Sequence, residues 1–171
     1  QVEQIDASDK LVVRNLMQLY LYEISKLEGP DEYREVDRHG LFRYDHLDHY
    51  WAESGRLAFL VWGDCKLAGF ALVSQNSALL KSHDMPAWLM AEFFVMRRHQ
   101  RKGIAEKAAR TIFDMLPGHW VVAEIAPNLD AQRFWRKVID RYTNGSYEEV
   151  FLNNDDWHGP AQSFVSKSHM P

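Results

Sequence analysis

The sequence has a single cysteine, Cys65, so a disulfide within the chain cannot form. Few cysteines are typical of proteins that stay in a reducing compartment. No apolar run approaches the roughly 20 residues needed to cross a bilayer, and residues 1–10 lack the apolar core of a signal peptide. We therefore expect a cytoplasmic protein with no membrane partner.

The sequence also lacks an excess of positive charge, with 20 Lys and Arg against 24 Asp and Glu and a formal net charge of −4 at pH 7. This balance argues against a whole-surface nucleic-acid binder. Hydrophobic residues make up 46% of the 171 positions, enough for a sizeable core. No repeat or Pro/Gly-rich linker divides the chain, so we predict one domain over residues 1–171.

The spacing of apolar residues changes several times along the chain between the helical and the extended period. It predicts helices over 8–27, about 44–53, 103–116 and from 128 to about 139. It predicts strands over 2–5, 56–62, 67–74, 88–96, 119–126, 147–152 and 161–167, the second and third forming a hairpin at Gly63-Asp64. Helices and strands in this order predict an α/β (α+β) domain with a mixed sheet flanked by helices.

Positive charge gathers at one junction between a predicted strand and a predicted helix, at Arg97, Arg98, Arg101 and Lys102. Free backbone N–H groups at a helix start favour an anion, and Gly103 leaves room for it to approach. The junction is not a Walker A loop, because no Ser or Thr follows the Lys-Gly pair, and it lacks the three glycines of a dinucleotide fingerprint. An anion site and a merely solvated basic helix start both remain open from these residues alone.

Two segments carry a family resemblance. Gln100-Arg101-Lys102-Gly103-Ile104-Ala105 resembles the Gln/Arg-x-x-Gly-x-Gly/Ala signature of the GNAT superfamily of acetyl-CoA-dependent N-acetyltransferases, and residues 128–137 are similar to its block Asn-x-x-Ala-x-x-Phe-Tyr-x-Lys. The resemblance implies a mixed, mostly antiparallel seven-stranded sheet with about four helices. It also implies that the fourth and fifth strands splay apart.

The same resemblance implies acetyl-CoA as co-substrate and no metal. The loop N–H groups would hold the pyrophosphate of coenzyme A, and the pantetheine arm would run along the strand that carries Val95. The residues that the resemblance assigns to coenzyme A are Phe94, Val95, Met96, Arg101, Lys102, Gly103, Ile104, Ala105, Asn128, Phe134 and Trp135.

Attack of an amine on a thioester benefits from a base, for which Glu92 on the predicted central strand is the first candidate and Glu124 the second. A Glu92 that merely pairs with a neighbouring Arg or His is the alternative. Trp135 departs from the Tyr usual in the family, and an indole N–H is not a useful acid for the leaving thiolate. Tyr142, about two turns later, or water could supply that proton, or the thiolate could leave unassisted.

The aromatic segment around residues 42–51 has two interpretations. It lines the acceptor pocket, as the resemblance implies, or Phe42, Leu47, Tyr50 and Trp51 form part of a core. His46 and His49 have the spacing of a metal pair but no third ligand nearby in the sequence, so we expect no metal there.

These observations predict an N-acetyltransferase that moves acetyl from acetyl-CoA to a primary amine by direct attack in a ternary complex. The overall acidity suits a small cationic acceptor rather than a nucleic acid. A homodimer is left open. The alternatives are a non-catalytic acyl-CoA-binding or sensing module and a nucleic-acid-binding domain that uses the basic helix start.

Overall fold

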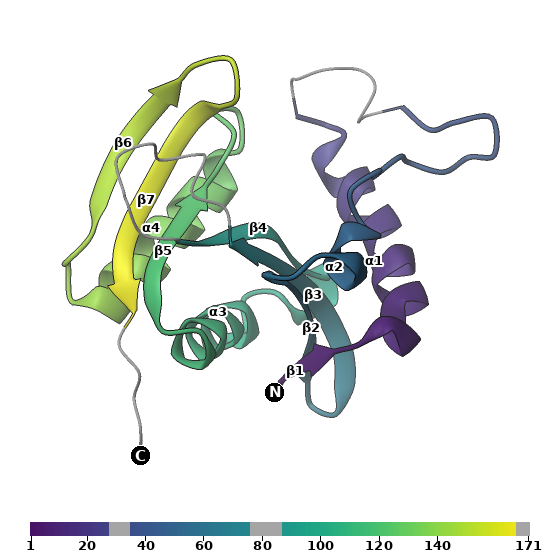
Figure 1. Cartoon of the computed structure of the whole chain (residues 1–171), viewed down its shortest axis with the longest axis horizontal. Helices are drawn as coiled ribbons and strands as arrows, with labels where there is room; N and C mark the ends of the chain where they lie inside the picture. Colours follow the sequence, from purple (N-terminus) through teal and green to yellow (C-terminus); the bar gives the residue numbers. More distant parts are fainter. Residues whose placement is uncertain (28–34, 76–86, 167–171) are drawn as a thin grey trace.

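The computed structural model describes residues 1–27, 35–75 and 87–166, which form one seven-stranded sheet (Figure 1). The strands lie in the order β1-β2-β3-β4-β5-β7-β6, and each pair of neighbours is antiparallel except β4 and β5. Their bounds are Val2–Ile5 (β1), Arg56–Gly63 (β2), Lys66–Gln75 (β3), Trp88–Val95 (β4), Gly118–Ala123 (β5), Glu148–Asn153 (β6) and His158–Ser166 (β7). The mixed, mostly antiparallel sheet predicted from the sequence is confirmed.

Four α-helices flank the sheet: Lys10–Ile24 (α1), His49–Ala52 (α2), Ile104–Met115 (α3) and Leu129–Thr143 (α4). Short 3-10 turns stand at Ala7–Asp9 (η1) and Arg97–His99 (η3). The predicted second helix over 44–53 is shorter than expected, because residues 44–49 form single turns, such as His49 N–H to His46 C=O at 3.3 Å. Gly29-Pro30, a pair that favours a helix end just after the predicted first helix, lies outside the described residues.

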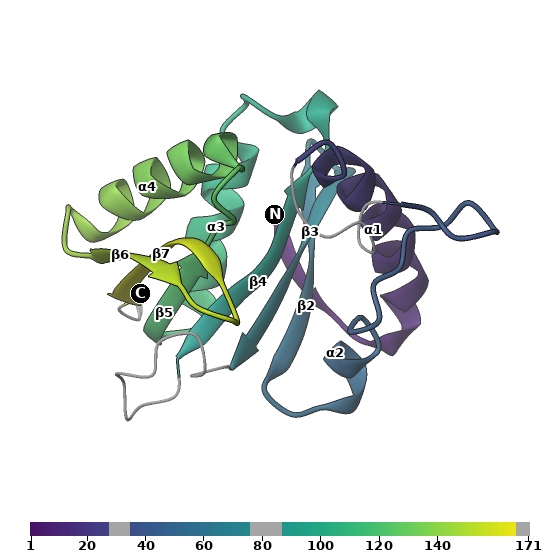
Figure 2. The same ribbon diagram turned by 90° about the horizontal axis from the view of Figure 1, so that it is seen from above.

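The helices divide between the two faces of the sheet, as Figure 2 shows for α1 and α3 on either side of β4. On one face, Leu16 and Met17 of α1 pack with Phe70 of β3. On the other, Phe113 of α3 and Ile139 of α4 pack in a cluster with strand residues that include Trp120. Each face thus buries its own apolar cluster, which fixes the helices against the strands.

The sheet is incompletely paired at its centre. β4 and β5 match at only three positions, Trp88 with Trp120, Leu89 with Val121 and Met90 with Val122. β4 nevertheless continues along β3 as far as the pair Gly69 and Val95. Among the described residues, nothing pairs with the β5-facing edge of β4 beyond Met90. The splay that the resemblance implied is therefore present, and it leaves backbone groups that can bind an extended ligand.

Gly69 gives a test of how β3 and β4 hold this edge in place. A Cβ atom at Gly69 would collide with the backbone carbonyl oxygen of Phe94, which cannot move without disturbing β4. We expect Gly69→Ala to lower the free energy of unfolding by about 3 kcal/mol, measured by urea denaturation.

Gly40→Ala is the control, because a Cβ there meets nothing within 4 Å and only the left-handed backbone (φ +75°) resists it. We expect that control to cost about 1 kcal/mol. Equal losses for the two variants would contradict the close approach of β3 to β4.

Candidate cofactor and acetyl-transfer site

The basic loop between β4 and α3 has the geometry of an anion site. Arg101 and Gly103 both adopt left-handed backbone conformations, with φ of 58° and 75°. Gly103 caps α3 without a side-chain hydrogen bond, and its carbonyl accepts from Lys107 N–H at 3.0 Å, so the N–H groups before Lys107 have no partner within the helix. A Cβ on Gly103 would meet nothing within 4 Å, so the space beside this glycine at the start of α3 is open.

Gln100 holds this loop against the strand that precedes it. Its side-chain amide donates to the backbone carbonyl of Val95 at 2.8 Å. The family signature therefore has a structural meaning at Gln100 as well as at Gly103. One residue ties the loop to the end of β4, and the other keeps the space above the helix start clear.

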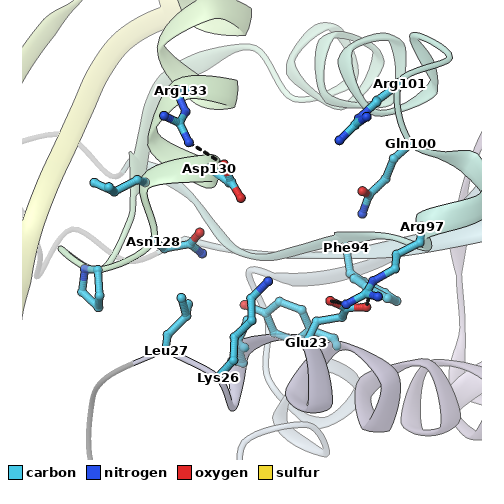
Figure 3. A pocket seen from close by; sticks show the side chains of 14 residues that line it. Glu23, Lys26, Leu27, Phe94, Arg97, Gln100, Arg101, Asn128, Asp130 and Arg133 are labelled. Carbon is cyan, nitrogen blue, oxygen red and sulfur yellow. Dashed lines mark hydrogen bonds and ion pairs between the residues drawn. The ribbon is translucent and has the colours of Figure 1, made fainter.

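A pocket of about 750 Å³ opens beside this loop, between the end of α1, the end of β4 and the start of α4 (Figure 3). Its wall includes Tyr20, Phe94, Gln100, Arg101 and Asn128. The pocket thus extends from Gln100 and Arg101 of the basic loop to Phe94 at the end of β4.

Charged side chains on the pocket wall are mostly basic. Arg97 makes a two-point ion pair with Glu23 of α1, with nitrogen–oxygen distances of 2.6 and 2.8 Å. Arg133 pairs with Asp130 at 2.6 Å, and Lys26 and Arg101 also help to lower the pKa of that carboxyl (Figure 3). These four cations, against two carboxylates, give the pocket the charge that a polyphosphate ligand requires.

Glu92 lies on the α1 side of β4 because of a bulge in the strand. Leu72 of β3 pairs with Glu92 and Val73 pairs with Met90, so Ala91 is an extra residue. The Tyr44 hydroxyl donates to Glu92 Oε1 at 3.0 Å, and Tyr20 faces the same carboxylate. Burial raises the pKa of Glu92, and the two phenols oppose this only in part. A carboxylate of raised pKa is suited to accept a proton.

Glu124, the second candidate base, lies on the α4 side of the sheet. Gln162 of β7 donates to its Oε2 at 3.2 Å and to Glu149 Oε2 at 2.8 Å, and Glu149 pairs with Arg136 of α4 at 2.8 Å. Burial, reinforced by Glu149, raises the pKa of Glu124 to about 7. The structure therefore does not bring Glu92 and Glu124 together.

The aromatic residues of α4 pack in one cluster with residues of both β4 and β5. Phe93 of β4 stacks on Phe134 with ring centroids 6.0 Å apart and meets the Trp135 ring edge-on at 5.1 Å. Asn128 caps the helix, its side chain accepting from Ala131 N–H at 3.2 Å. The roles of Phe134, Trp135 and Asn128 toward coenzyme A stay predictions.

Tyr142 lies near the far end of α4, about 20 Å along the helix axis from Asn128. Its hydroxyl donates to Asp114 at 2.8 Å, and burial together with this bond raises its pKa. A proton held in this way is less available to a leaving thiolate. The role of Tyr142 as the acid stays a prediction.

The aromatic segment before α2 contributes to the core on the α1 face, where Leu47 and Tyr50 are buried and Phe42 and Trp51 pack against them. His46 and His49 lie with ring centroids 5.6 Å apart, and His49 pairs with Glu53 at 3.0 Å. Within residues 1–27, 35–75 and 87–166, no group of three or more His, Cys, Asp or Glu side chains could hold a metal ion.

Sequence reasoning missed several residues of the site, among them Tyr20, Glu23, Lys26 and Tyr44. Tyr20 lies in the predicted first helix at the helical spacing of its apolar residues, and a tyrosine on such a face needs a partner for its hydroxyl. That requirement was the available signal, but the sequence does not name the partner.

Comparison with known proteins agrees with this geometry. Residues 20–139 match the model of the Acetyltransferase (GNAT) family, so the chain belongs to that family. A comparison with curated proteins gave no match. In the described part of the chain, no helix is long and apolar enough to cross a membrane.

Solved structures share the fold at low sequence identity. The ribosomal-protein-S18-alanine N-acetyltransferase from Escherichia coli aligns with a TM-score of 0.60 and 12% identity, over 100% of this chain and 96% of that one. An aminoglycoside 6′-N-acetyltransferase complexed with coenzyme A aligns with a TM-score of 0.58 and 12% identity, over 100% of this chain and 99% of that one. An aminoglycoside acetyltransferase from an uncultured soil metagenomic sample, in complex with sisomicin, aligns with a TM-score of 0.56 and 16% identity. The alignment covers 81% of this chain and 86% of that one.

The buried position of Glu124 predicts a pH-dependent stability. The unfolded chain releases this proton near its ordinary pKa of 4.5, whereas the folded protein holds it to about pH 7. The contribution to stability is thus complete below pH 4.5 and is lost as the pH rises through 7. We expect Glu124→Gln to match the native protein at pH 5 and to exceed its free energy of unfolding by about 3 kcal/mol at pH 8, measured by urea denaturation.

Glu149→Gln is the matched control within the same cluster. The Arg136 ion pair lowers the pKa of Glu149, so this variant should be less stable than the native protein at pH 8. The loss should shrink only at acidic pH, below the ordinary glutamate range. If the difference in free energy of unfolding between Glu124→Gln and the native protein is the same at pH 5 and pH 8, the raised pKa of Glu124 is contradicted.

Proposed function

We propose that this protein is an N-acetyltransferase that moves an acetyl group from acetyl-CoA to the primary amine of a small-molecule acceptor. The observation that carries the proposal is the unpaired edge of β4 between the anion-binding loop and Glu92. That edge offers backbone partners to an extended arm anchored by its phosphates. We expect the whole of residues 1–171 to act as one such domain in the cytoplasm.

The loop fits the phosphates of coenzyme A. Free N–H groups and the helix dipole favour an anion, and the empty space above Gly103 admits one. Arg101 and Lys102, both exposed, add charge at the same point. When bound, acetyl-CoA supplies the activated acetyl group, and the thiolate is its leaving group.

The backbone of β4 offers a donor for the thioester carbonyl. Met96 N–H is already used, because it donates to the Ala68 carbonyl at 2.8 Å. Backbone groups alternate sides along an antiparallel strand, so Val95 N–H faces the open edge. We assign the stabilisation of negative charge on the carbonyl oxygen to Val95 rather than Met96.

Glu92 acts as the base in this mechanism. Most alkylamines carry a proton at pH 7, and the neutral amine must also lose a proton after it attacks. The bulge at Ala91 turns Glu92 toward α1 and Tyr44, at the end of the unpaired edge. Positioning of the two reactants in one ternary complex supplies a further part of the rate.

A small cationic acceptor suits the charge of the protein. The chain has a formal net charge of −4, which attracts a cation over distance. Two of the similar structures are aminoglycoside acetyltransferases by name, whereas another acts on a ribosomal protein. Incubation with acetyl-CoA and a panel of polyamines, aminoglycosides and amino compounds, followed by free-thiol release, tests the proposal. Binding without release across the panel would favour a sensing module.

Gly103→Glu tests the phosphate loop. A carboxylate in front of the helix start occupies the anion's place and repels it, so we expect coenzyme A affinity to fall about a hundredfold or more. Gly40→Glu is the matched control, because Gly40 has the same φ of +75° and the same open surroundings. Isothermal titration with coenzyme A measures both. Unchanged affinity in Gly103→Glu would contradict the loop assignment.

Glu92→Gln tests the base. The amide cannot accept the proton, so we expect kcat/KM to fall about 10²- to 10⁴-fold while coenzyme A affinity stays near the native value. The acidic limb of the pH–rate profile that reports Glu92 should disappear, and the limb set by the amine should remain. A reduced rate with an unchanged profile would mean that Glu92 has a structural role instead.

A further inference from the structure

We propose that the hydroxyl of Tyr20 carries the proton from the acceptor amine to Glu92. The inference rests on the proposed acetyl transfer and adds a catalytic residue to it. Glu92 is not part of the pocket wall, whereas Tyr20 both lines the pocket and faces the Glu92 carboxylate. A group that must exchange protons with a ligand in the pocket therefore needs an intermediary, and Tyr20 is in that place.

The ring of Tyr20 is held firmly enough for this task. It meets Phe70 of β3 edge-on, with centroids 6.0 Å apart and an interplanar angle of 87°. It also contacts Phe94 of β4 at 5.8 Å. These two rings are themselves buried, at 0% and 7% exposure, so the phenol has little freedom to turn away from Glu92.

Other groups face Glu92 from the elements around it, and they differ from Tyr20 in one respect. Tyr44, before α2, donates to the carboxylate at 3.0 Å, and Tyr50 of α2 is close enough to act on it electrostatically. Arg56 of β2 lies over the Tyr50 ring at 5.4 Å and is paired with Glu53 at 2.6 Å. None of these side chains forms part of the pocket wall, and the β3 residue opposite Glu92 is the apolar Leu72.

The proton and electron count closes without a further reactant. The amine nitrogen forms a bond to the acetyl carbon as the carbon–sulfur bond breaks, and the electron pair leaves with the thiolate. The nitrogen's proton passes to the Tyr20 oxygen while the phenol's own proton passes to Glu92. Tyr20 is a neutral phenol before and after, and Glu92 becomes a neutral acid that returns its proton to the thiolate or to water.

Tyr20→Phe and Tyr44→Phe form a matched pair for the test. Each removes one phenol from the Glu92 carboxylate, so each should shift the acidic limb of the kcat/KM profile upward in pH. Only Tyr20→Phe breaks the path to the pocket. We expect it to lower kcat about 10²- to 10³-fold with unchanged coenzyme A affinity, and Tyr44→Phe to lower kcat less than tenfold.

Folding is checked in the same samples by thermal unfolding. Phenylalanine keeps the ring contacts with Phe70 and Phe94, so the Tm of Tyr20→Phe should stay within a few degrees of the native value. Equal kcat for the two variants, in a native enzyme that turns over, would overturn the relay and leave the acetyl transfer intact. A native protein that binds coenzyme A but releases no thiol with any amine of the panel would overturn the proposed function and the relay with it.

Discussion

The short parallel contact between β4 and β5 is the constraint on which the rest of the site depends. Three residue pairs hold the two strands together, and the pairing ends at Met90 and Val122. A fully paired sheet would leave no backbone donors or acceptors for a ligand. Because the pairing stops early while β4 continues along β3, the strand has one satisfied edge and one open edge. The basic loop follows the end of this strand, and Phe94 of the same strand lines the pocket.

The buried carboxylates on the two faces of the sheet have different partners. Glu92 faces two phenols that supply hydrogen bonds without charge, and one of them, Tyr20, lines the pocket. Glu124 faces an amide and a second carboxylate beneath α4, in a cluster closed by Arg136. Burial raises the pKa of both, but only Glu92 has a neighbour, Tyr20, that also lines the pocket. A perturbed carboxyl group is thus a guide to function only together with its access to the pocket.

Local features of this protein were predictable from the sequence, and features made by tertiary contact were not. Gly103 and the Asn128 cap act through their own backbone neighbours, so the sequence pattern around each is enough to predict them. The direction of Glu92 depends on the bulge at Ala91, which no residue type announces. Its partners Tyr20 and Tyr44 lie 72 and 48 positions before it in the chain. The helix predicted over 44–53 is shorter in the structure because its first residues form single turns with bonds from Leu47 to Tyr44 and from His49 to His46.

Beyond Met90, where β4 no longer pairs with β5, aromatic rings pack β4 against α4. Phe93 of β4 packs on Phe134 and Trp135 of α4, so these rings hold β4 to the helix that follows β5. A ladder of hydrogen bonds has one spacing, whereas the separation across packed rings follows their volume and tilt. The distance between β4 and α4 therefore depends on ring volume, and exchange of one ring for another would change it without breaking a strand hydrogen bond. Trp135, at the position where the family resemblance implies tyrosine, is one of these rings.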